Sequence, residues 1–286
     1  MNIFLKLGGV RFRFDFDCDI IVEDTIVPFF CSAENVIDIN IHVLHDFTLA
    51  PLPRGPMVGE DLLMEYYRQD QRLLCLTKGG QGRFLSCCSW EEGSTELTCW
   101  LNFPSGSPAD TLGNILRMIP LLRLLLQSGV LFFHASQVAL DDIGILFSAP
   151  SGTGKTTQAK LWSRYRGAQI LCNDRTLTDL RHTYGYPVDG SEPISSNQIR
   201  DLGAIVLLEQ APVNTVVRLS PRRALTMLMP QLVLDAWDPG ARSAAAELLL
   251  ELIARTPVYL LKCTPDEQAV QCLSQQLWKD RVITNA

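Results

Sequence analysis

The chain has 286 residues, of which 47% are hydrophobic and 20% charged, enough to bury the core of one large or two moderate globular domains. Its net charge of −6 and its lack of a basic block disfavour nucleic acid or an anionic membrane as a partner. No stretch is typical of a signal-peptide core or a membrane span. Nine cysteines without paired zinc-ligand spacing indicate free thiols, and we expect a cytoplasmic protein in which Cys87 and Cys88 are structural.

Short segments with strand composition run from Gly8 to Trp100. The strict alternation of apolar and polar residues over Val10–Phe16 predicts a half-buried strand. Further strand candidates, separated by turns that contain Pro, Gly or acidic residues, are Ile20–Val22, Val36–Val43, Arg72–Thr77, Gly82–Cys88 and Glu96–Phe103. The sequence therefore predicts a mostly antiparallel N-terminal β domain over residues 1–105, with an irregular proline-rich connection at 50–56.

A Pro/Gly/Ser stretch at Phe103–Pro108 predicts the domain boundary. Apolar residues then recur at helical spacing from Leu112 to Ile119, and the Leu121–Leu126 run after Pro120 predicts a short buried helix. Strand and helix patterns alternate in the remainder of the chain. We therefore predict an α/β domain over residues 106–286.

The central motif is the stretch 144–157, in which an apolar strand breaks into a glycine-containing loop and then a helix. Two glycines let backbone N–H groups turn inward, the helix presents the positive end of its dipole, and a lysine adds a full charge. Ala149 stands where the first glycine of a P-loop (Walker A) is usual. The pattern still predicts a nucleotide phosphate site formed by Ser151, Gly152, Thr153, Gly154, Lys155, Thr156 and Thr157.

A carboxylate follows the next predicted strand, Ala168–Cys172, in the sequence Asn173-Asp174-Arg175. A strand-end acid beside a phosphate loop is typical of Mg²⁺-nucleotide chemistry, with Asp174 and the hydroxyl of Thr156 or Thr157 as candidate metal ligands. At the C-terminus, Thr264-Pro265-Asp266-Glu267 predicts a helix start with Thr264 as the N-cap, a structural role.

These motifs together resemble the HPr kinase/phosphorylase and phosphoenolpyruvate carboxykinase superfamily, in particular the HPr-kinase-related proteins of bacterial peptide-modification pathways. The resemblance covers about residues 111–280 and is carried by His134-Ala135-Ser136, Ser148–Thr157, Asn173-Asp174, Asn197-x-x-Arg200 and Cys263–Glu267. It implies a strand-rich α/β nucleotide-binding core of the phosphoenolpyruvate-carboxykinase type.

The resemblance also implies roles for single residues. Lys155 would hold the terminal phosphates and Thr156 the metal. Asp174 would accept the proton of the attacking hydroxyl, and His134 matches the histidine that precedes the loop. Arg200 would neutralise charge on the transferred group. Arg175 stands where the family has a second acid. Asp189 or Glu192, in the loop that follows, could take the place of that acid.

We therefore expect an enzyme that uses ATP and Mg²⁺ to phosphorylate a hydroxyl of a peptide or small protein, recognised by the N-terminal sheet. Two alternatives stay open: a carboxykinase-like enzyme for a small acid, and a nucleotide-binding scaffold without turnover, which Arg175 favours. The sequence is compatible with a monomer or a homo-oligomer.

Overall fold

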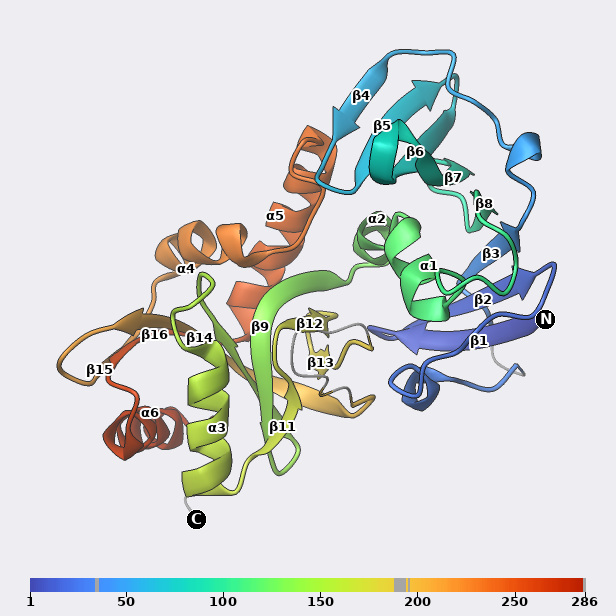
Figure 1. The fold of residues 1–286 in the computed structure, drawn as a ribbon. Helices are drawn as coiled ribbons and strands as arrows, with labels where there is room; N and C mark the ends of the chain where they lie inside the picture. The colour runs from blue at the N-terminus through green and yellow to red at the C-terminus, as the bar shows by residue number, and fades with distance from the viewer. Residues whose placement is uncertain (34–35, 188–193, 195, 285–286) are drawn as a thin grey trace. The chain divides into compact units, whose positions relative to one another are not determined.

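The computed structural model describes residues 1–33, 36–187, 194 and 196–284. The chain forms two compact units (Figure 1). Unit 1 comprises Met1–Ser128 and Asp235–Ala241, and unit 2 comprises Gly129–Leu234 and Arg242–Ala286. Within the described ranges, no helix combines the length and the apolar character that crossing a membrane requires.

Unit 1 is built on one eight-stranded sheet with the order β1-β2-β3-β8-β7-β6-β5-β4. Its strands are β1 Asn2–Leu7, β2 Val10–Phe16, β3 Ile39–Leu44, β4 Met57–Glu60, β5 Met64–Gln69, β6 Arg72–Lys78, β7 Phe84–Glu91 and β8 Glu96–Leu101. Neighbouring strands are antiparallel except that β2, β3 and β8 run parallel to one another. The carboxyl ends of these three strands therefore meet at one edge of the sheet.

Two helices, α1 (Leu112–Met118) and α2 (Leu121–Gln127), belong to unit 1. The Met118 carbonyl accepts hydrogen bonds from side chains of the sheet, including the Thr77 hydroxyl at 3.3 Å and the Cys88 thiol at 3.3 Å. The boundary predicted at residues 105/106 therefore differs from this division, because the helices that follow the Pro/Gly/Ser stretch bury their apolar residues with the N-terminal sheet. The cysteines of this sheet, Cys87 and Cys88 included, are free thiols in its interior.

Unit 2 contains a second eight-stranded sheet, in which β9 and β10 are antiparallel and β10, β14 and β16 are parallel. Its strands are β9 Leu131–Leu140, β10 Ile143–Ser148, β11 Gln169–Cys172, β12 Arg175–Thr178, β13 His182–Tyr184, β14 Ile199–Gln210, β15 Thr215–Arg218 and β16 Val258–Cys263. Its helices are α3 Lys155–Arg166, α4 Pro221–Leu228, α6 Glu267–Lys279 and α5 Pro239–Arg255, whose residues up to Ala241 group with unit 1.

Helices α3 and α6 lie side by side in unit 2 (Figure 1) and share one buried core with the sheet. Trp162 of α3 and Leu273 of α6 pack there with Phe147, Val206 and Tyr259 of the parallel strands. The alternate residues of these strands are buried as well, so both faces of the sheet are covered. This is the mixed, strand-rich α/β architecture that the alternating patterns predicted.

Several local predictions differ from the structure. Ile20–Val22 forms only one isolated bridge, from Ile21 to Thr111, and Gly80–Gly82 is a 3-10 turn that delays β7 to Phe84. The last helix is capped by Asp266 instead of Thr264, because the Asp266 carboxylate accepts the Ala269 N–H at 3.1 Å. The sequence patterns also missed several strands: β1, β4, β5, β12, β13 and β15.

Candidate functional site

The strand–loop–helix segment of unit 2 runs from β10 through residues 149–154 into α3. Gly152 and Gly154 have φ values of 78° and 118°, in the region that side chains disfavour, whereas a Cβ at either position would meet no atom within 4 Å. Backbone conformation, not lack of space, therefore requires glycine. No side chain of the described residues caps the start of α3, and its first turn contains no acid, so the positive helix end is not neutralised locally.

The environment of Ala149 explains why the loop can begin with a residue other than glycine. Its side chain is 1% exposed and belongs to the same buried cluster as Phe147, Ala159 and Trp162. The methyl group therefore fills the core beneath the loop. Its carbonyl faces the loop and accepts a hydrogen bond from Lys155 Nζ at 3.0 Å.

Lys155 is the one buried cation among the described residues of the loop, with a relative exposure of 7%. Burial lowers the pKa of its ammonium group, and the negative charge of Asp174 partly opposes that effect. The Asp174 carboxylate is therefore within electrostatic reach of Lys155. A buried ammonium group of this kind is suited to an anion that replaces its lost hydration.

Asp174 is positioned by the strands on either side of it. Its backbone carbonyl accepts the Ala135 N–H at 3.0 Å, and the carbonyl of Asn173 accepts the Ser136 hydroxyl at 2.5 Å, so both residues are fixed to β9. The Asp174 side chain lies 2.8 Å from His134 Nε2. Its other oxygen lies 3.7 Å from Nε of Arg175, the first residue of β12.

The two halves of the site meet because β9 lies next to β10 with Ala135 opposite Ser148, the last residue before the loop. The Ser148 hydroxyl donates to the His134 carbonyl at 2.9 Å. His134 and Asp174, which are 40 positions apart in the sequence, are thus brought together at the base of the loop. The fold thus places the His134–Asp174 pair beside the loop that carries Lys155.

The hydroxyl residues of the loop differ in exposure. Ser151 and Thr157 are exposed, whereas Thr156 is half-buried in the first turn of α3. Thr153 contributes its backbone carbonyl, which accepts the Gln210 side-chain amide at 3.3 Å. Two threonines of the first turn therefore offer hydroxyl oxygens for a cation, and Thr157 also lines the pocket described below.

Arg200 is the predicted site residue that the fold does not bring to the loop. It lies within β14, where its neighbour Asp201 pairs with Ile143, the first residue of β10, whereas Leu207 pairs with Ser148. Its guanidinium group donates to the carbonyls of Asp141 and Ile199 at 3.2 and 2.8 Å. Arg200 therefore lies near the first residue of β10, whereas the loop follows its last residue.

Asp189 and Glu192, considered from the sequence as substitutes for a second acid, lie outside the residues that the structure describes.

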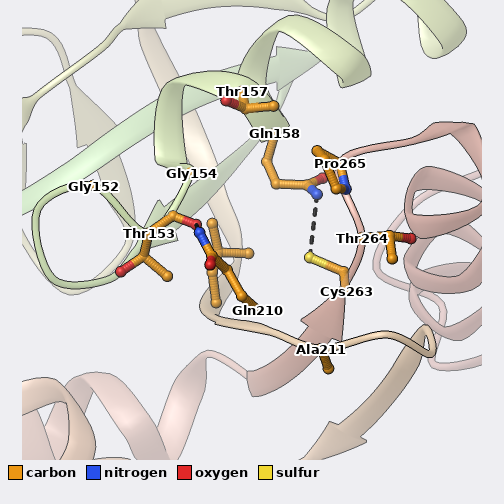
Figure 2. Close-up of a pocket in the computed structure, with 11 residues that line it drawn as sticks. Gly152, Thr153, Gly154, Thr157, Gln158, Gln210, Ala211, Cys263, Thr264 and Pro265 are labelled. Atoms are coloured by element: carbon orange, nitrogen blue, oxygen red, sulfur yellow. Dashed lines mark hydrogen bonds between the residues drawn. The ribbon is translucent and has the colours of Figure 1, made fainter.

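A pocket of about 520 Å³ adjoins the loop at the carboxyl ends of β10, β14 and β16 (Figure 2). Ligands of open α/β sheets bind at this edge, and the volume suits a small-molecule ligand. The lining residues are Gly152, Thr153, Gly154, Thr157, Gln158, Leu208, Gln210, Ala211, Cys263, Thr264 and Pro265. Sequence reasoning missed Gln158, Gln210 and Ala211 as lining residues.

None of the described lining residues carries a charged side chain. Gln158 donates its amide to Cys263 Sγ at 3.3 Å (Figure 2), and burial raises the pKa of the Cys263 thiol. Cys263 is therefore an uncharged thiol at neutral pH. The site consists of a cationic loop beside a neutral pocket, an arrangement that fits a ligand with an anionic and an uncharged part.

No protein-family model matches the chain, and no curated protein matches it. The structure of the Hpr(Ser) kinase/phosphatase from Coxiella burnetii is similar to 52% of this chain and 98% of its own chain, with 14% sequence identity and a TM-score of 0.31. A similarity at this level carries no argument about fold or chemistry. The site is therefore interpreted from its own geometry, and the family resemblance remains a prediction.

Proposed function

We propose that unit 2 binds Mg²⁺-ATP and transfers the γ-phosphoryl group to a hydroxyl of a peptide or small protein. The observation that carries the proposal is the buried Lys155 ammonium group inside a glycine loop, within electrostatic reach of the His134–Asp174 pair. Phosphoryl transfer depends on holding the phosphates, neutralising their charge and orienting the attacking group. The site offers residues for each task.

The loop and the pocket support nucleotide binding together. The first N–H groups of α3 and Lys155 would hold the phosphates, because the helix start is positively polarised without an acidic cap and Lys155 adds a full positive charge. The neutral pocket, which shares Gly152, Thr153, Gly154 and Thr157 with the loop, would hold the nucleoside. Mg²⁺ would be held by the Thr156 hydroxyl and the Asp174 carboxylate and would supply charge neutralisation at the phosphates.

Asp174 supports chemistry as well as binding. In the proposed reaction the acceptor oxygen bonds to the γ-phosphorus, the bond to the β-phosphate oxygen breaks, and the acceptor proton passes to Asp174. The 2.8 Å contact with His134 would orient the carboxylate. His134 is accordingly a positioning residue.

The experiment compares Asp174→Asn with Arg175→Ala in nucleotide binding and in transfer from γ-labelled ATP to Ser- and Thr-containing peptides. Asp174→Asn keeps the shape of the side chain but removes its basicity, so we expect ATP to bind while transfer falls by about 10²-fold or more. Arg175→Ala should reduce transfer less, because a guanidinium group neither ligates a cation nor accepts a proton. Wild-type transfer rates in Asp174→Asn would contradict the mechanism.

A nucleotide-binding scaffold without turnover is the second candidate. It is favoured by Arg175, which replaces a second acid and lies 3.7 Å from the carboxylate that would have to act alone. Tight, Lys155-dependent ATP binding without transfer to any acceptor or hydrolysis, across a Mg²⁺ titration, would favour the scaffold. A carboxykinase-like reaction on a small acid has no specific support in the described residues.

A further inference from the structure

A second cluster of reactive side chains lies in unit 1, at the sheet edge where the parallel strands β2, β3 and β8 end. Asp17 and Cys18 directly follow β2, and His45 directly follows β3. Among the residues that the structure describes, these form the group of His, Cys and acidic side chains whose ligand atoms all lie within 4.8 Å of one another. The parallel register of β2 and β3 places Phe16 opposite Val43 and so brings the three side chains together.

The side chains of Asp17 and Cys18 both contact Nδ1 of His45. His45 Nδ1 lies 3.0 Å from Cys18 Sγ and 2.7 Å from Asp17 Oδ1. In a tetrahedral zinc site the ligand atoms are about 3.2 to 3.7 Å apart, given metal–ligand bonds of about 2.0 to 2.3 Å. A metal ion could therefore be accommodated if these atoms separated by less than about 1 Å.

Outer contacts orient the set as they do in metal sites. His45 Nε2 lies 3.0 Å from Asp110 Oδ1, and Asp110, which is 0% exposed, accepts the Gly106 N–H on its other oxygen. A carboxylate that accepts the second ring N–H leaves the lone pair on Nδ1, facing Cys18 and Asp17. The Ser105 hydroxyl donates to Cys18 Sγ at 3.1 Å.

We propose that Asp17, Cys18 and His45 bind one divalent metal ion of the zinc class, with Asp110 as the carboxylate that orients His45. A set of one sulfur, one nitrogen and one oxygen ligand selects Zn²⁺ over Mg²⁺ and Ca²⁺, which prefer oxygen ligands only. Three protein ligands leave a fourth position for water or an external group. The half-buried Cys18 and exposed Asp17 leave the site accessible to the ion.

The simpler interpretation is a charged His45 held between two carboxylates, with no metal. It accounts for Asp17 and Asp110 but gives no role to the thiol 3.0 Å from the same nitrogen or to the serine that donates to that thiol. The two interpretations differ in one measurable property, because only the metal site requires Cys18 as a thiolate ligand.

The test uses the full chain, treated with a chelator and then dialysed against Zn²⁺ or Co²⁺ in excess Mg²⁺. We expect one Zn²⁺ per chain and, with Co²⁺, a thiolate-to-metal charge-transfer band. Cys18→Ser should abolish that band and weaken Zn²⁺ binding by more than about 100-fold, whereas Asp110→Asn should weaken it by about 10 to 100-fold. Cys31→Ser is the matched control, because Cys31 is another half-buried free thiol of the same unit that lies outside the cluster, and it should keep both properties.

Two results would overturn the proposal. One is a wild-type protein that retains no Zn²⁺ after dialysis and shows no charge-transfer band with Co²⁺, a readout that does not depend on any variant being folded. The other is Cys18→Ser with unchanged affinity and an unchanged Co²⁺ spectrum in a protein whose circular dichroism matches the wild type. Both would leave the charged-histidine clamp as the explanation.

Discussion

Burial of the Lys155 ammonium group disfavours the folded state. Burial lowers the pKa of its ammonium group below the ordinary value of 10.5, with Asp174 opposing the shift. Between the folded-state pKa and 10.5 the unfolded chain binds more protons, so stability should rise with pH through that window. Below the window the buried charge disfavours the folded state by a constant amount.

Replacement of this lysine should therefore separate stability from binding. We expect Lys155→Met to raise the thermal midpoint at neutral pH, and the gain over wild type to shrink as the pH approaches 10.5. The same variant should lose most of its affinity for Mg²⁺-ATP in calorimetric titration. Lys279→Met, which removes an exposed lysine of α6, is the control and should change neither property. Undiminished ATP affinity in a folded Lys155→Met protein would refute nucleotide binding at the loop.

At the scale of a single element, α3 begins and ends at glycines with left-handed backbone conformations. Gly154 at the N-terminus has a φ of 118° and Gly167 at the C-terminus has a φ of 65°. A Cβ at either position meets no atom within 4 Å, so alanine introduces backbone strain without a steric clash. The two glycines are therefore matched in backbone strain and in space, but only Gly154 belongs to the loop.

Gly154→Ala and Gly167→Ala should each lower the free energy of unfolding by about 1–2 kcal/mol, the usual penalty for a left-handed non-glycine residue. Only Gly154→Ala should weaken ATP binding, because relief of its strain rotates the first N–H groups of α3 away from the loop. Chemical denaturation measures the first effect and calorimetry the second. Equal ATP affinities in both variants would show that the helix start does not contact the phosphates.

At the scale of the whole molecule, the segment Asp235–Ala241 leaves the unit 2 portion of the chain and joins unit 1. Arg123 of α2 holds it through Asp235 at 3.3 Å and Asp238 at 2.6 Å, and its guanidinium group lies 5.3 Å from the centre of the Trp237 ring. The Trp237 ring also packs on Tyr66, with 4.8 Å between ring centres. Arg123 and Asp235 are almost completely buried, so neither charge is solvated if its partner is removed.

Arg123→Met should lower the free energy of unfolding by about 3–5 kcal/mol, because it leaves a buried carboxylate unpaired. The double variant Arg123→Met/Asp235→Asn should recover part of that loss, since the more deeply buried of the two carboxylates, Asp235, is then replaced by an uncharged amide, while Asp238 is 19% exposed. Arg72→Met, which removes an exposed pair with Glu91, is the control and should cost less than about 1 kcal/mol. Equal losses for Arg123→Met and Arg72→Met would show that the segment is not held by its buried ion pair.

Because Asp235–Ala241 belongs to unit 1, cutting the chain at one position does not separate the two units. A fragment that begins near Ser107, the boundary region predicted from the sequence, would divide unit 1 and remove the sheet that α1 and α2 cover. It would also leave Trp237 and Asp235 without Tyr66 as a partner. The role in recognising the acceptor that the sequence analysis predicts for the N-terminal sheet is therefore better tested by point substitutions in the full chain than by truncation.

The sequence by itself determined the features whose causes are local. The glycines, the lysine and the hydroxyl residues of the loop are consecutive, and their conformations depend on neighbouring residues. The succession of strand, loop and helix through residues 148–157 could therefore be predicted without a structure. The place of Asp174 just after a strand was predicted for a similar reason, because a polar residue that follows an apolar run indicates a strand end. Thr264 failed as a cap because Asp266, two residues later, competes for the same helix start.

The tertiary structure decided what depends on strand order and direction. Gln210 and Cys263 reach the pocket, and Arg200 does not reach the loop, because β14 runs parallel to β10 and to β16. Cys18, His45 and Asp110 are separated by 27 and 65 positions and have no recognisable spacing. Parallel pairing of β2 and β3 nevertheless brings Cys18 to His45, and Asp110 reaches His45 from the segment between β8 and α1. Hydrophobic alternation specifies which face of a strand is buried, but it does not specify which strands become neighbours, and that pairing places the side chains.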